Sequence, residues 1–254
     1  INTRPFEKRS FFLLDTDKMT VEPMLESVWL NSALWSRDSK KLLFLGGPSS
    51  FDNIANTLPK DKIPNDFDYQ LFVYDVGTKK AEAITKSFDP SPTNISWQHS
   101  NNFIYVLATD KSDVGLFTYS VKKKRFRRFD TGAVEVISRI GFAGNHRTAV
   151  YWGSGSSSPH KLYNINLSSG KSKVLKDYNR DLFRDTVIGQ TKDFDFKTAK
   201  GQTITGRLHY PPDFNPQKKY PCIVYYYGGT APVTRSFGGR YPKHWYAANG
   251  YMVY

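Results

Sequence analysis

Residues 219–229 read KYPCIVYYYGG, and this stretch predicts a strand followed by a tight loop. Residues 223–227 form a continuous run of β-branched and aromatic side chains, which is typical of a strand buried on both faces. Pro221 is compatible with the first position of that strand, where its missing N–H breaks no hydrogen bond of the sheet. Gly228 and Gly229 end the run. We therefore expect a fully buried strand that leads directly into a glycine loop.

A short helix and a second strand are expected directly after the glycine loop. Residues 241–249 are compatible with a helix whose first turn contains Pro242, and Gly250 lies where a C′ glycine would end it. Residues 251–254 form an apolar segment that is typical of a strand. The predicted order of strand, glycine loop, helix and strand is one βαβ unit.

This order fits the early part of an α/β-hydrolase domain. In that plan the loop after the third strand carries a donor of the oxyanion hole, and the nucleophile lies on a later strand-to-helix elbow. We expect such an elbow beyond Tyr254, so the chain is predicted to be truncated before its nucleophile.

A repeat precedes this region. Its clearest strands begin at Leu71, Leu116 and Leu162, which lie 45 and 46 residues apart. Each of these strands is followed by a polar turn and a short strand, and each is preceded by two further strands joined by residues typical of turns. Four short antiparallel strands in a repeat of this length are the signature of β-propeller blades.

The repeat defines the predicted domains. Residues 11–15 and 19–24 match the third and fourth strands of a blade, so we expect about three four-stranded blades plus a half blade. An open ring of this size leaves strand edges unpaired, which predicts that the chain is truncated at both ends. We therefore predict a mainly β fold, with a partial β-propeller at residues 1–185 and the start of an α/β-hydrolase domain at 186–254.

Composition predicts a globular protein. The chain has 254 residues, of which 39% are hydrophobic and 15% aromatic, enough for a packed core. No run approaches the roughly 18 apolar residues of a membrane helix, so no membrane span is predicted. Cys222 is the single cysteine, which excludes an internal disulfide and a zinc site built on cysteines, and we expect it to be buried. No metal or cofactor is indicated.

Charge raises a second possibility, because the net charge is +13 and residues 122–128 read KKKRFRR. Such a run can bind nucleic acid. However, it falls at a predicted hairpin turn, with Phe126 and Phe129 expected to face inward between solvated charges. We therefore predict no nucleic-acid partner.

Two segments between predicted strands are unusual. Residues 46–68 form a long polar insertion, which is typical of either a functional or a disordered loop. Residues 153–160 read GSGSSSPH. We expect a flexible loop there rather than a phosphate cradle, because no strand-to-helix context exists.

The second domain resembles the start of the hydrolase domain in a known family. The residues that carry the resemblance are GQTITGRL at 201–208, YPPDF at 210–214, KKYP at 218–221 and YGG at 227–229. Following a propeller, they resemble the prolyl oligopeptidase family of serine peptidases, particularly its dipeptidyl peptidase IV and acylaminoacyl-peptidase-like branches. The resemblance implies acyl-enzyme hydrolysis of peptides, with a propeller that restricts substrate access. It also favours a periplasmic or secreted location and allows a homo-oligomer.

By this resemblance, Tyr227 is the tyrosine whose hydroxyl helps to form the oxyanion hole, and Gly228 and Gly229 support the loop. A preorganised O–H donor stabilises the anionic oxygen that forms when a peptide carbonyl is attacked. Tyr225 and Tyr226 are interpreted as packing residues.

The chain also departs from the family pattern. It contains no G-x-S-x-G, and all five histidines precede the expected elbow, so His209 and His244 are interpreted as structural. It has no adjacent pair of glutamates to anchor a substrate amine, and the proline expected after the glycines is displaced to Pro232. The alternative function is therefore a non-catalytic propeller that serves as a scaffold or binding module.

Overall fold

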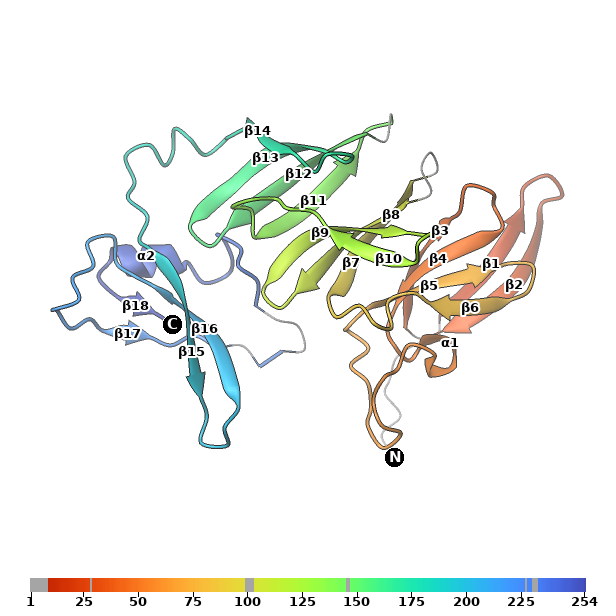
Figure 1. Cartoon of the computed structure of the whole chain (residues 1–254), viewed down its shortest axis with the longest axis horizontal. Helices are drawn as coiled ribbons and strands as arrows, with labels where there is room; N and C mark the ends of the chain where they lie inside the picture. Colours follow the sequence, from red (N-terminus) through yellow and green to blue (C-terminus); the bar gives the residue numbers. More distant parts are fainter. Residues whose placement is uncertain (1–8, 28, 99–102, 145–146, 227, 230–232) are drawn as a thin grey trace. The chain divides into compact units, whose positions relative to one another are not determined.

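A computed structural model describes residues 9–27, 29–98, 103–144, 147–226, 228–229 and 233–254. The chain divides into two compact units (Figure 1). The first unit contains residues 1–111 and 115–129, and the second contains residues 112–114 and 130–254. Strands dominate both units, and the described residues include two short helices.

The first unit begins with a two-stranded hairpin, as the half blade predicts. Strand β1 (Arg9–Asp15) pairs antiparallel with β2 (Thr20–Ser27). A four-stranded antiparallel sheet follows, in the order β3 (Leu30–Trp35), β4 (Lys41–Gly46), β5 (Gln70–Asp75) and β6 (Lys80–Ala83). The next four strands are β7 (Ser91–Gln98), β8 (Phe103–Asp110), β9 (Asp113–Ser120) and β10 (Arg125–Arg128). These sheets are the predicted blades.

The core of the first unit lies on both faces of β4, because side chains alternate between the two faces of a strand. Leu42 and Phe44 pack in a cluster that partly buried Phe11, from β1, also joins. Leu43 and Leu45 point the other way and pack with residues that include Ile104 of β8. The apolar faces of this blade are therefore buried against the neighbouring strands of the same unit.

The basic run at residues 122–128 forms the turn between β9 and β10 and the outer strand β10. Phe126 stacks on Phe88 with ring centroids 4.0 Å apart, and Phe129 is buried. The prediction that these two aromatic residues face inward is confirmed. Lysines and arginines along an outer strand also protect an exposed sheet edge from pairing with other chains.

The long insertion between β4 and β5 has a defined conformation and includes the short helix α1 (Ser50–Asn53). Asp66 is buried and accepts hydrogen bonds from the backbone N–H and the hydroxyl of Ser49, at 2.8 and 2.9 Å. This carboxylate ties the two ends of the insertion together. Of the two alternatives for this loop, the disordered one is wrong.

The second unit contains the last blade and a mixed sheet. The blade is antiparallel, in the order β14 (Ser172–Lys176), β13 (Ser158–Asn166), β12 (Thr148–Gly155) and β11 (Val136–Phe142). The mixed sheet has the order β15 (Thr191–Lys197), β16 (Thr203–His209), β18 (Met252–Val253) and β17 (Cys222–Ile223). The domain boundary at residues 185–186 stays a prediction.

The predicted βαβ unit is present. Strands β17 and β18 are parallel, and helix α2 (Lys243–Ala248) lies between them in the chain. Gly250 has a φ of +86°, which favours glycine and suits the end of the helix. The tertiary fold thus agrees with the order predicted from residues 219–254.

The prediction of a fully buried strand at residues 223–227 is wrong for residues 223–226, the part of it that the structure describes. Regular strand structure covers Cys222–Ile223, Cys222 is exposed, and the side chains of Val224 and Tyr226 are 62% and 87% exposed. Within this chain β17 is last in the strand order of the sheet, with β18 as its neighbour among the described residues. An apolar run predicts a strand, but burial depends on what lies beside it.

The flexible loop predicted at residues 153–160 is also wrong. Strand β12 runs to Gly155 and β13 starts at Ser158, and these two residues pair across a tight turn. Within the part of the chain that is described, no helix is long and apolar enough to span a membrane.

Candidate functional site

The predicted oxyanion tyrosine, Tyr227, lies outside the described residues. Gly228 and Gly229 are described and are exposed. An added Cβ on Gly228 would have no atom within 4 Å, so its surroundings are open. The role of these three residues stays a prediction.

A polar cleft lies in the second unit, in the same compact unit as the glycine loop. Its volume is about 530 Å³, and it is lined by the β12–β13 turn, Glu135, and charged residues of β15, β16 and the segment before α2. Among the described residues no group of three His, Cys, Asp or Glu side chains could hold a metal ion. Several charged residues that line the cleft form ion pairs with one another.

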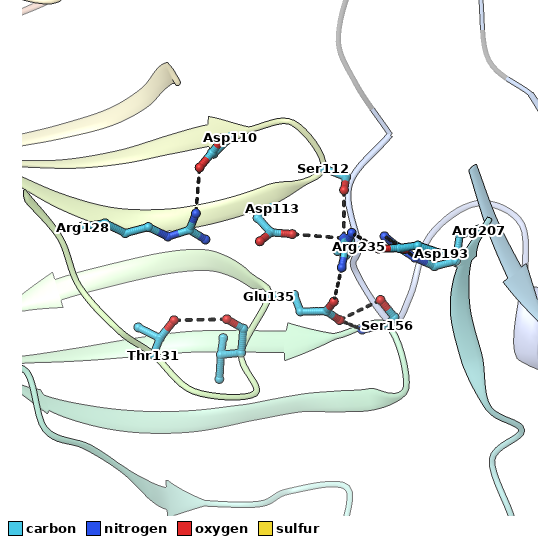
Figure 2. Close-up of polar contacts among 11 residues, drawn as sticks. Asp110, Ser112, Asp113, Arg128, Thr131, Glu135, Ser156, Asp193, Arg207 and Arg235 are labelled. Carbon is cyan, nitrogen blue, oxygen red and sulfur yellow. Dashed lines mark hydrogen bonds and ion pairs between the residues drawn. The ribbon is translucent and has the colours of Figure 1, made fainter. Parts of the chain in front are cut away.

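Arg235 lies at the centre of these ion pairs (Figure 2). Its Nε is 2.9 Å from the Ser112 hydroxyl oxygen and 3.1 Å from Asp113 Oδ1. Its Nη1 donates to Glu135 Oε1 at 2.9 Å, and its Nη2 donates to Asp193 Oδ2 at 2.6 Å. We call these five residues the Arg235 cluster. A planar guanidinium suits this arrangement, because its donors point in fixed, separate directions.

A second arginine completes the charge balance at Asp193. Arg207, directly across the β15–β16 pair, donates to Asp193 Oδ1 from Nε at 3.0 Å and from Nη2 at 2.9 Å. Burial would raise the pKa of Asp193, but the hydrogen bonds from Arg207 and Arg235 outweigh it and hold that pKa below its ordinary value. Asp193 is therefore ionised at neutral pH and bridges the two arginines.

Glu135 connects the Arg235 cluster to the β12–β13 turn. Its Oε2 accepts a hydrogen bond from the Ser156 hydroxyl at 2.7 Å and another from the Ser156 backbone N–H. Burial would raise the pKa of Glu135, but these bonds and Arg235 outweigh it and lower the pKa. A carboxylate with a lowered pKa is a weaker base than an ordinary carboxylate, which disfavours Glu135 as a general base for the Ser156 hydroxyl.

Gly153 and Gly155 allow residues 133–135 to approach strand β12 closely. A Cβ on Gly153 would lie 2.6 Å from Val134 Cγ1, and one on Gly155 would lie 2.9 Å from the Ala133 carbonyl oxygen. Either contact is too short for a side chain, so only glycine lets residues 133–135 lie against β12. The glycines of the GSGSSS run thus serve close packing.

Two histidines lie beside the same turn. His244 Nε2 is 2.6 Å from the Ser156 carbonyl oxygen, which only accepts, so Nε2 carries the proton. The His244 ring packs edge-on against His209, with centroids 5.0 Å apart, and stacks on Phe237. The pKa of His209 is lowered to about 3. Burial is the largest cause, and the repulsion that a protonated His244 would exert is the second. Both histidines are packed as neutral side chains, in agreement with a structural role.

Sequence reasoning did not single out the Arg235 cluster. Its members come from the start of β9 and the residue before it, the residue before β11, strand β15 and the segment before α2. The one local signal was the position of Arg235, six residues after the glycine pair. No spacing rule links it to carboxylates that lie 42 to 122 residues earlier in the chain.

Comparisons with known proteins identify relatives of the chain. No protein-family model matches it. The dipeptidyl-peptidase 5 of Porphyromonas gingivalis is 27% identical over 191 residues, which cover 72% of this chain and 27% of that protein. The probable dipeptidyl-peptidase 5 of Aspergillus clavatus is 24% identical over 233 residues, which cover 88% of this chain and 30% of that protein. The chain thus spans less than a third of the length of these relatives.

Solved structures share the fold. The uncomplexed Pyrococcus horikoshii acylaminoacyl peptidase matches with a TM-score of 0.56 at 15% identity, covering 97% of this chain and 55% of that one. A puromycin hydrolase matches with a TM-score of 0.60 at 14% identity, covering 92% of this chain and 34% of that one. The predicted fold class is confirmed. The sequence relatives, which are named dipeptidyl-peptidases, support the resemblance to the prolyl oligopeptidase family of serine peptidases.

Proposed function

Given that resemblance, we propose that this chain supplies propeller blades and the beginning of the hydrolase domain to a serine peptidase that cleaves peptides through an acyl-enzyme. The observation that carries the proposal is the combination of four-stranded blades with a βαβ unit whose first strand, β17, is followed in the sequence by Gly228–Gly229. The dipeptidyl-peptidase 5 relatives support a peptide as substrate. The propeller, in this proposal, restricts which peptides reach the catalytic centre.

In the proposed mechanism, the Tyr227 hydroxyl donates a hydrogen bond to the oxyanion of the tetrahedral intermediate. When a serine attacks the peptide carbonyl, negative charge develops on that oxygen, and a preorganised donor stabilises it. The serine and its base are not assigned to residues of this chain. The Ser156–Glu135 pair is disfavoured as a substitute, because the lowered pKa of Glu135 makes it a weaker base than an ordinary carboxylate.

Active-site labelling tests the enzyme class. A fluorophosphonate should label one serine of the complete protein, whereas the 254-residue chain alone should stay unlabelled. Labelling of a serine within the chain would place the nucleophile inside it and overturn the proposed assignment. A complete protein that is neither labelled nor active on peptides would instead be the non-catalytic propeller scaffold.

Tyr227→Phe in the complete protein tests the oxyanion assignment. The ring is kept while the O–H donor is lost, so kcat should fall by about 10² to 10³ with little change in KM. Tyr226→Phe is the matched control, because Tyr226 is its chain neighbour and its side chain is highly exposed. Equal kcat in both variants and the parent would show that Tyr227 is not the donor.

A further inference from the structure

We propose that Arg235 is a positioning residue, which fixes the segment leaving the glycine loop so that the oxyanion donors are held in their productive geometry. The inference rests on the proposed function. It concerns how the loop is held, rather than which atom donates to the intermediate.

The segment needs an anchor. The described residues between Gly229 and α2 form neither helix nor strand, so backbone ladders do not hold them in place. Arg235 lies six residues after Gly229 and eight before Lys243, the start of α2. Donors of an oxyanion hole must keep hydrogen-bond distance to a particular point, and a misplacement of about 1 Å can lower the rate about 10²-fold. A loop of this kind requires contacts from outside itself.

Arg235 provides contacts with three other parts of the second unit. Its backbone N–H donates to the Ser112 carbonyl oxygen at 2.9 Å. Its guanidinium reaches Asp113, the first residue of β9, Glu135, directly before β11, and Asp193 in the sheet that also contains β17. The segment after the glycine loop is therefore tied both to the blade and to its own sheet.

The charge balance makes the anchor specific. Three carboxylates surround Arg235, and Arg207 also pairs with one of them, Asp193. The Arg235 side chain is 23% exposed, so these attractions are only partly screened by water. Without Arg235, the carboxylates would repel one another and the segment would lose its polar link to the blade.

The geometry favours positioning over substrate binding. Each of the three guanidinium nitrogens is already engaged by a partner of this chain, so Arg235 is not poised to hold a substrate carboxylate. Further along, the Phe237 ring stacks on His244 with centroids 4.8 Å apart and contacts Phe183 edge-on. These aromatic contacts hold the end of the segment nearer α2, and Arg235 holds the part nearer the glycine loop.

The test measures steady-state kinetics of the complete protein with Arg235→Met and Arg235→Lys. We expect Arg235→Met to lower kcat about 10²-fold with KM changed less than about 3-fold, because donors are displaced while substrate contacts remain. Lysine keeps the positive charge but lacks the planar set of N–H donors of the guanidinium, so Arg235→Lys should recover part of kcat. Arg240→Met removes an exposed arginine from the same segment and is the matched control, expected to leave kcat unchanged.

Two readouts separate positioning from general destabilisation. Hydrogen exchange should rise in residues 228–240 of Arg235→Met and stay unchanged in strands β4 and β5. In a protein that already carries Tyr227→Phe, Arg235→Met should lower kcat much less than it does in the parent protein, because both changes act through the same donor. If Tyr227→Phe itself lowers kcat, a fully multiplicative loss in the double variant would overturn the inference. A rise in KM without a fall in kcat, or an unchanged kcat, would overturn it in any case.

Failure of the proposed function is distinguishable from failure of this inference. If Tyr227→Phe is silent but Arg235→Met still lowers kcat and raises exchange in residues 228–240, Arg235 positions the loop and the donor is another group. If Arg235→Met lowers the unfolding midpoint of the whole protein, Arg235→Lys is compared with the parent protein instead. The inference is overturned if Arg235→Lys is folded and its hydrogen exchange in residues 228–240 rises while its kcat is unchanged.

Discussion

The sheet β3–β6 and the sheet β15–β18 each contain four strands but are held in different ways. In the first, Leu43 and Phe44 of β4 are both 0% exposed, because neighbouring strands of the unit cover both faces. In the second, Phe194 and Phe196 of β15 are 50% and 42% exposed, and the contacts with the rest of the unit are mainly ion pairs and histidine packing. The comparison shows that apolar burial stabilises the blades, whereas polar geometry orients the sheet that carries the glycine loop.

The largest effect is expected from a cavity in a blade. Phe44→Ala should lower the free energy of unfolding of the first unit by about 3–5 kcal/mol, because a fully buried ring is lost. Phe196→Ala, on the exposed face of β15, is the control and should change it by less than about 1 kcal/mol. Urea unfolding, combined with hydrogen exchange in β4 and β5, measures the change in unfolding free energy for both variants. Similar losses for the two variants would break the comparison.

A smaller effect on stability is expected from a side chain added at Gly153, which lies close to Val134 in the second unit. Gly153→Ala places a Cβ 2.6 Å from Val134 Cγ1, so it should destabilise the last blade by about 1–3 kcal/mol. Gly141→Ala in strand β11 is the control, since its Cβ would meet no atom within 4 Å. The unfolding free energies of the two variants are compared with that of the parent. Equal stability would show that residues 133–135 do not pack tightly on β12.

Acid should weaken the second unit through His209. Its pKa is about 3 in the folded state, below the ordinary 6.5, so the unfolded state binds a proton first as the pH falls. Stability is complete above about pH 6.5 and should fall by at most about 1.4 kcal/mol per pH unit below it. The groups facing His209 are His244, Lys243, Arg207 and Thr191.

Urea unfolding between pH 7 and pH 5 measures this slope, above the range in which Glu135 and Asp193 lose their charge. His209→Gln should flatten the profile, because the variant has no imidazole to protonate. A slope that persists unchanged in His209→Gln would assign the acid sensitivity to another group, with His244 as the next to test, since its pKa is lowered by burial as well.

The smallest effect is expected from an exposed ion pair. Lys124 Nζ is 2.7 Å from Glu82 Oε1, but both side chains are more than half exposed, so water and salt screen the attraction. Lys124→Gln should therefore leave the thermal midpoint unchanged. Glu135→Gln, in the half-buried Arg235 cluster, should lower the midpoint measurably. A larger shift for Lys124→Gln than for Glu135→Gln would reverse the proposed difference between surface pairs and this cluster.

The blades could be predicted from the sequence because their determinants are local. Alternating apolar residues and turns such as those after Val76 and Val121 recur every 45 or 46 residues, and each strand pairs with its neighbour in the chain. The βαβ order was predicted for the same reason, since Pro242 and Gly250 mark the ends of α2. Burial of residues 223–226 was predicted wrongly, because it depends on neighbours that are distant in sequence.

Sequence alone therefore determined the fold class, the strand order within each blade and the glycine loop at Gly228 and Gly229. Only the tertiary structure brought Ser112, Asp113, Glu135 and Asp193 to Arg235. The physical reason is that a charge cluster carries no periodicity. Its stability depends on distances of about 3 Å between side chains from separate elements, and those distances exist only after the last blade and the mixed sheet have folded.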